Sequence, residues 1–174
     1  MAHSKLVLNF ALGRRNQETT DIFIEGLRAA TAANPFQITK DGSQPYISAI
    51  ETTLSDRVDY RMLIKVCRAP REGEQRYSPA NVVEALPRPV LGDPDRQRIC
   101  TSHIERQNLT MRMQIRRLTR LTYGFSKKWE NLWAAVCLHF AWYNFVRIHQ
   151  TLRFTPAMEA GIADRVWTVG ELLA

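Results

Sequence analysis

Two carboxylates, those of Asp41 and Glu105, are candidates for chemistry at a phosphate group. Asp41 follows a short apolar run, so we expect it at the end of a strand, where open α/β sheets display ligand-binding and catalytic groups. The Asp41-Gly42 pair is also ordinary turn chemistry. Carboxylates from distant segments can together hold Mg²⁺ or Mn²⁺, because these hard ions prefer oxygen ligands. The pair therefore indicates a metal-dependent reaction at phosphate.

Glu105 stands at the head of a segment that is rich in cations. From residue 106 to residue 128, here called the basic segment, the sequence has seven cations and no acid: Arg106, Arg112, Arg116, Arg117, Arg120, Lys127 and Lys128. A charge run is usually a solvated face, but exposed helices normally interleave acids with cations at i, i+4. The lack of acids favours a polyanionic partner.

Ser102 and Glu105 have the spacing of a capping box, which predicts a helix with Ser102 as its N-cap. A capping carboxylate is then the simplest interpretation of Glu105. The functional interpretation is based on the side that it shares, because Glu105, Asn108, Arg112 and Arg116 recur at helical spacing. Packing alone would rarely line one side of a helix with an acid, an amide and two arginines.

Composition indicates a single globular domain in 174 residues, with 45% hydrophobic and 24% charged residues. The net charge of +7 and the pI near 9.7 favour nucleic acid as a partner. A membrane surface is less favoured, because the cations are not confined to the polar face of one amphipathic helix.

Three cysteines lie far apart in sequence, which argues against a zinc site or a disulfide framework. The first residues lack the pattern of a signal peptide, and no window is apolar enough to cross a membrane. We therefore expect a soluble, cytoplasmic protein.

Hydrophobic patterning predicts an α/β layer fold from alternating strands and helices. The expected strands are 5–12, 36–40 and 60–66, and the expected helices are 16–31, with Ile22, Phe23 and Leu27 buried, and 45–54. Residues 69–100 carry five prolines and predict an irregular insertion with one short helix near 81–86. A flap or DNA-contacting loop and a surface insertion without function both fit this composition.

Two further helices are expected toward the C-terminus. Ser126 is a candidate cap for a long one, and Thr155-Pro156 is typical of the start of a short one. The long helix carries an apolar stripe that predicts core packing more readily than stacking on bases: Trp129, Trp133, Val136, Phe140 and Tyr143.

Several motifs together resemble the DDE transposases of bacterial insertion sequences. They are TKDG at 39–42 with Tyr46, RYSPA at 76–80, ERQNLTMR at 105–112, RLTRLT at 117–122, FSKK at 125–128, YNFVRIH at 143–149 and TPAM at 155–158. The resemblance covers essentially all of the chain and implies an RNase H-like, integrase-type layered fold with long C-terminal helices. It implies that Asp41 and Glu105 are catalytic ligands of Mg²⁺ or Mn²⁺, and that intact members form homo-oligomers.

DNA is the partner that the resemblance implies, both as transposon ends and as target. Its candidate contacts are Arg106, Asn108, Arg112, Arg116, Arg117, Arg120, Lys127, Lys128, Arg147 and His149. The 64 positions from Asp41 to Glu105 exceed the spacing in integrases, and the proline-rich insertion accounts for the excess.

In the family the first catalytic Asp ends a central strand just before the run at 5–12, which puts this Asp at or immediately before Met1, and no acid precedes Glu18. We therefore expect a catalytic dyad in place of the triad, without the DNA-recognition region that lies upstream in the family. We expect a domain truncated at its N-terminus whose metal-dependent cleavage and transfer of DNA strands is weak or absent. The alternative is a non-catalytic fragment that binds DNA or regulates the intact enzyme.

Overall fold

The computed structural model describes residues 4–68, 81–119 and 122–174. The chain is a mixed α/β protein that divides into two compact units, one of residues 9–101 and one of residues 1–8 with 102–174. The coarse α/β expectation is confirmed.

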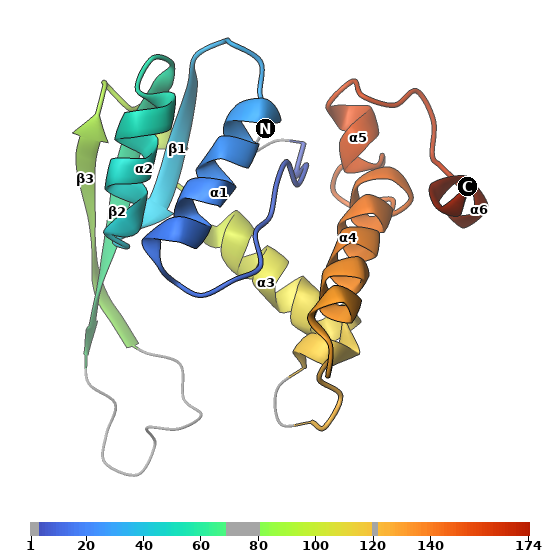
Figure 1. The fold of residues 1–174 in the computed structure, drawn as a ribbon. Helices are drawn as coiled ribbons and strands as arrows, with labels where there is room; N and C mark the ends of the chain where they lie inside the picture. Colours follow the sequence, from blue (N-terminus) through green and yellow to red (C-terminus); the bar gives the residue numbers. More distant parts are fainter. Residues whose placement is uncertain (1–3, 69–80, 120–121) are drawn as a thin grey trace. The chain divides into compact units, whose positions relative to one another are not determined.

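The unit of residues 9–101 contains a mixed sheet with the order β1-β2-β3 in its described part. Strand β1 (Phe36–Asp41) runs parallel to β2 (Val58–Arg68), which pairs antiparallel with β3 (Asn81–Leu91) (Figure 1). Parallel strands need a crossover, and α2 (Pro45–Leu54) supplies it. The strand expected at 36–40 is confirmed and includes Asp41.

Two helices cover one face of this sheet. Helix α1 (Gln17–Ala29) starts at Asn16, whose side chain accepts a hydrogen bond of 3.1 Å from the Thr19 N–H. Helix α2 begins with Pro45 in its first turn, as expected, since proline lacks only an N–H that would stay unbonded there. Both starts were predicted correctly.

The core of this unit lies between the helices and β2. Its fully buried side chains include Ile24 of α1, Ile50 and Leu54 of α2, and Tyr60 and Met62 of β2. Phe23 and Leu27 pack against this cluster, but Ile22 is 59% exposed, so its predicted burial was wrong. Helix α1 turns Ile24 toward the sheet, and Ile22 is therefore directed toward solvent.

Residues 5–12 do not form the expected strand. Val7 instead pairs with one side chain, because its N–H donates to Asn144 Oδ1 at 3.1 Å and its carbonyl accepts from Asn144 Nδ2 at 2.8 Å. The Asn144 amide thus supplies both bonds that a neighbouring strand would have made. Val7, within this apolar, β-prone run, therefore has both backbone groups satisfied without a neighbouring strand.

The short helix expected near 81–86 is also wrong, because these residues belong to β3. Pro87 and Pro89 made a strand look unfavourable in the sequence. Strand β3 lies at an edge of the described sheet, where prolines two residues apart can both direct their missing N–H groups away from the ladder. Residues 69–80 of the predicted insertion lie outside the described part.

The second unit is helical in its described residues. Its elements are α3 (Ser102–Gln114), the 3₁₀ turn η2 (Arg116–Leu118), α4 (Trp129–Phe145), α5 (Pro156–Glu159) and α6 (Val169–Leu173). A further 3₁₀ turn, η1 (Arg96–Arg98), belongs to the sheet unit. None of the helices in the described ranges is long and apolar enough to cross a bilayer.

Helix α4 differs from the prediction at its start. It begins at Trp129 after Lys128, while Ser126 Oγ accepts a hydrogen bond of 2.9 Å from Arg117 Nη1 instead of capping the helix. The end of the predicted stripe is core, with Val136, Phe140 and Tyr143 buried. Its beginning is not, because Trp129 and Trp133 are 53% and 45% exposed.

The C-terminal caps follow ordinary local chemistry. Thr155 Oγ1 accepts from the Met158 N–H at 3.2 Å and opens α5, as predicted. A capping box of Thr168 and Glu171 opens α6, which the sequence analysis missed although the pattern is readable in the residues.

We predict that Asn144→Ala lowers the free energy of unfolding by about 1 to 3 kcal/mol, because both polar groups of Val7 lose their partner in a partly buried place. Urea denaturation measures this. Asn131→Ala on the exposed part of the same helix is the control and should change stability by less than about 0.5 kcal/mol. Equal effects of the two variants would contradict the bridging role.

Candidate functional site

Asp41 is the last residue of β1 and lies beside Leu63 of β2 in the parallel register. The chain turns at once, since the Ser43 N–H donates to the Asp41 backbone carbonyl at 2.8 Å. The carboxylate is 56% exposed, so a ligand from solvent can reach it. This is the strand-end position that the sequence predicts.

The neighbouring lysine occupies one oxygen of this carboxylate. Lys40 Nζ lies 2.5 Å from Asp41 Oδ1 and 4.0 Å from the centre of the Tyr46 ring on α2. Partial burial disfavours the charged carboxylate, but the ammonium, a hydrogen bond from the Ser43 backbone and the charge of Arg15 outweigh it and lower the pKa of Asp41. Asp41 is therefore ionised at neutral pH and already neutralised by a cation.

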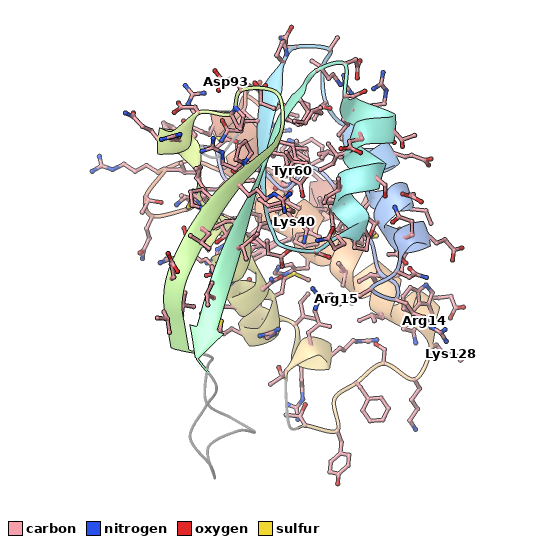
Figure 2. The ribbon with its side chains drawn as sticks, turned by 90° about the vertical axis from the view of Figure 1, so that its left-hand side faces the viewer. Arg14, Arg15, Lys40, Tyr60, Asp93 and Lys128 are labelled. Carbon is pink, nitrogen blue, oxygen red and sulfur yellow. The ribbon has the colours of Figure 1, made fainter. Side chains whose placement is uncertain are left out.

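Tyr60 of β2 lies on the face of the sheet that carries Lys40. Its partner in the register is Ile38, two residues before Lys40, and Figure 2 shows the labelled Tyr60 and Lys40 beside one another on the sheet. Burial, and then the charge of Asp41, raise the pKa of Tyr60 to about 12. Its hydroxyl is buried and has no hydrogen-bond partner among the described residues. Such a group is costly unless a water or ligand atom satisfies it.

Glu105 belongs to the other unit, where it lies exposed in the first turn of α3. Helix α3 begins at Ser102 itself, so Ser102 takes the first helical position and not the predicted N-cap position before it. A carboxylate in this first turn is favoured by the helix dipole. Asn108 and Arg112 follow on the same helix, so this part of the predicted side is present.

Arg116 does not extend that side. Helix α3 ends at Gln114, and Ile115 is extended with φ −102° and ψ 100° before Arg116 enters the 3₁₀ turn. Ile115 is buried, so the chain leaves the helix where an apolar side chain enters the core. The predicted continuous side from Glu105 to Arg116 is therefore wrong at its last member.

The cations of the basic segment lie on the surface. In the described residues the exposed ones are Arg106, Arg112, Arg116, Arg117, Lys127 and Lys128, whereas Arg120 lies outside the described part. Gly124 brings the chain back onto Arg116, since a Cβ at this glycine would lie 3.2 Å from Arg116 Cγ. In its described residues the segment forms a helix, a 3₁₀ turn and irregular chain, each with exposed cations.

Arg147 and His149 follow α4 and are packed more closely. Arg147 Nη1 donates to Gln114 Oε1 at 3.3 Å, and its guanidinium lies 5.7 Å from the Trp142 ring. The His149 ring contacts Tyr143 edge to face at 4.6 Å. Burial, then the charges of Arg147 and Lys5, lower the pKa of His149 to about 4. At neutral pH His149 is thus uncharged, and any contact of its ring with a phosphate is a hydrogen bond without charge.

The carboxylate oxygens of Asp41 and Glu105 are of the kind that a hard divalent ion prefers, but the two residues belong to different units. Within the described residues no three His, Cys, Asp or Glu side chains gather into one group. Asp41 and Glu105 are the residues that the resemblance of the motifs assigns to Mg²⁺ or Mn²⁺, and no grouping of ligands among the described residues adds to that assignment.

Comparison of the chain with family models, with curated proteins and with solved structures finds no match.

Sequence reasoning missed the group around Asp41. Lys40 is two residues from Ile38, so strand alternation directs both side chains to the face that α2 covers. That alternation could have suggested Lys40 as a neighbour of Tyr46. The position of Tyr60 depends on the register between strands, which no local pattern reveals.

We predict that acid weakens the fold partly through His149. The pKa of this residue is about 4 in the folded chain and 6.5 in the unfolded chain, so the unfolded state binds the proton first as pH falls. The contribution of neutral His149 to the free energy of unfolding is complete above pH 6.5 and is lost as the pH falls toward 4. Below pH 4 the contribution of His149 no longer changes with pH.

Urea denaturation at several pH values measures this dependence. His149→Phe keeps a ring against Tyr143 and should flatten the slope between pH 6.5 and about 4. Burial and the charge of Arg147 also lower the pKa of His139. This histidine is present in the native protein and in the variant, so a residual slope remains in both. An unchanged slope in the variant would show that His149 is not held neutral.

Proposed function

We propose that this chain is part of the catalytic domain of a DDE-type transposase with an RNase H-like fold, which binds DNA and holds a divalent cation for cutting and joining it. The observation that carries the proposal is the basic segment, whose described cations are exposed and which contains no acid over 23 positions, 106 to 128. Such a surface is suited to a phosphate backbone.

Asp41 and Glu105 provide the metal ligands in this proposal. A bound Mg²⁺ would supply Lewis-acid stabilisation of a phosphate and would activate an attacking oxygen. Asp41 is accessible at its strand end, and Glu105 opens the helix from which the basic segment continues. In this proposal the Glu105 carboxylate acts at the reacting phosphate of the DNA, and the cations of the same helix contact the DNA backbone.

A non-catalytic DNA-binding or regulatory role is the second candidate. It is favoured by the Lys40 ammonium on Asp41, because a carboxylate that already has a counterion needs no metal. In that case DNA binding is independent of divalent cations and of both acids. Homo-oligomerisation, which the resemblance implies, stays a prediction under both functions.

We predict salt-sensitive binding of this chain to duplex DNA, with the logarithm of the association constant falling linearly with that of the salt concentration. Arg112→Gln and Arg116→Gln should each weaken binding on all sequences and reduce the slope by about 1, because each removes one phosphate contact. Fluorescence anisotropy of labelled DNA at several salt concentrations measures both quantities.

The control is Arg96→Gln, which removes the same charge from an exposed position of η1 outside the basic segment. It should leave the slope within error of the native value. If all three variants change the slope equally, net charge and not the basic segment governs binding. Equal affinity of native and Asp41→Asn chains with and without Mg²⁺ would favour the regulatory role.

A further inference from the structure

Lys40 and Asp41 form a contact that a metal site would have to break. Adjacent residues of a strand point to opposite faces, yet Asp41 Oδ1 turns back to within 2.5 Å of Lys40 Nζ. The ammonium thus occupies an oxygen of the carboxylate that the proposed function assigns to a divalent cation.

We propose that Lys40 is an internal counterion that competes with the divalent cation for Asp41 and so sets the metal affinity of this site. The inference rests on the proposed function, because it concerns the same carboxylate. Lys40 thus raises the concentration of metal that is needed to occupy Asp41.

The contact has the properties of a displaceable ion pair. Asp41 is 56% exposed and Lys40 24% exposed, so water screens their attraction and the pair contributes little to stability. A divalent ion brings twice the charge of the ammonium to the same oxygen. Displacement therefore costs little beyond the loss of one partly exposed contact.

Lys40 also has an alternative partner when it leaves Asp41. Its ammonium already lies 4.0 Å from the centre of the Tyr46 ring, whose face attracts cations. The strand register places the Lys40 side chain beside Met62 on the face covered by α2, and this holds the lysine stem. When Asp41 is released, the ammonium therefore keeps its contact with the ring of Tyr46.

The test is the affinity of the full chain for Mn²⁺, measured without DNA from the electron paramagnetic resonance signal of the free ion. Lys40→Gln removes the charge, and Lys40→Met removes it while keeping an unbranched apolar side chain beside Met62. We expect both variants to bind Mn²⁺ about three- to tenfold more tightly than the native chain, given one unit charge removed from a partly screened contact. Arg96→Gln, near the other end of β1 where Asp95 bonds to Gln37, should bind like the native chain.

The Asp41→Asn variant shows whether the measured Mn²⁺ is bound at Asp41. Tighter binding in both Lys40 variants that is lost when Asp41→Asn is added supports the inference. Binding that depends on Asp41 but is equal in native and Lys40 variants overturns the inference and leaves the metal site intact. Binding that is unaffected by Asp41→Asn in every background overturns the inference together with the metal-binding part of the proposed function.

Discussion

The parallel pairing of β1 with β2 is the constraint on which the site depends. It brings the end of β1 beside the middle of β2, so that Asp41 lies at the point where the sheet backbone turns away. The same register places Tyr60 diagonally from Lys40, under α2. The Asp41 carboxylate carries the Lys40 ammonium, and the Tyr60 hydroxyl, which is buried without a partner among the described residues, belongs to the face of the sheet that carries Lys40.

Much of the sheet unit could be predicted, because its signals are local. Proline at the start of α2 and asparagine at the start of α1 act within one turn, and β1 is a short apolar run that ends at a turn. The predictions for residues 5–12 and for β3 were wrong, because whether a segment forms a strand depends on its hydrogen-bonding neighbour in the fold. Asn144 takes the neighbour's place for Val7, and the edge position of β3 permits Pro87 and Pro89.

The candidate site was predictable in its residue types and not in its contacts. The uncompensated charge of residues 106–128 is visible in the sequence, but the break at Ile115 that takes Arg116 off the helix follows from tertiary burial. His149 was predicted as a contact to DNA on its type and neighbours, and its loss of charge arises from packing against Tyr143 and from Arg147. The Lys40 contact required a side chain to reach across its own strand.

The central claim is that Asp41 and Glu105 serve one divalent cation when the chain is bound to DNA. A double-mutant cycle tests it most directly, with Mn²⁺ affinity of the DNA-bound chain measured for the native protein, Asp41→Asn, Glu105→Gln and the double variant. Two ligands of one ion predict a large coupling, so that the second substitution costs far less than the first. Fully additive effects, or no effect of Glu105→Gln, would contradict a shared ion.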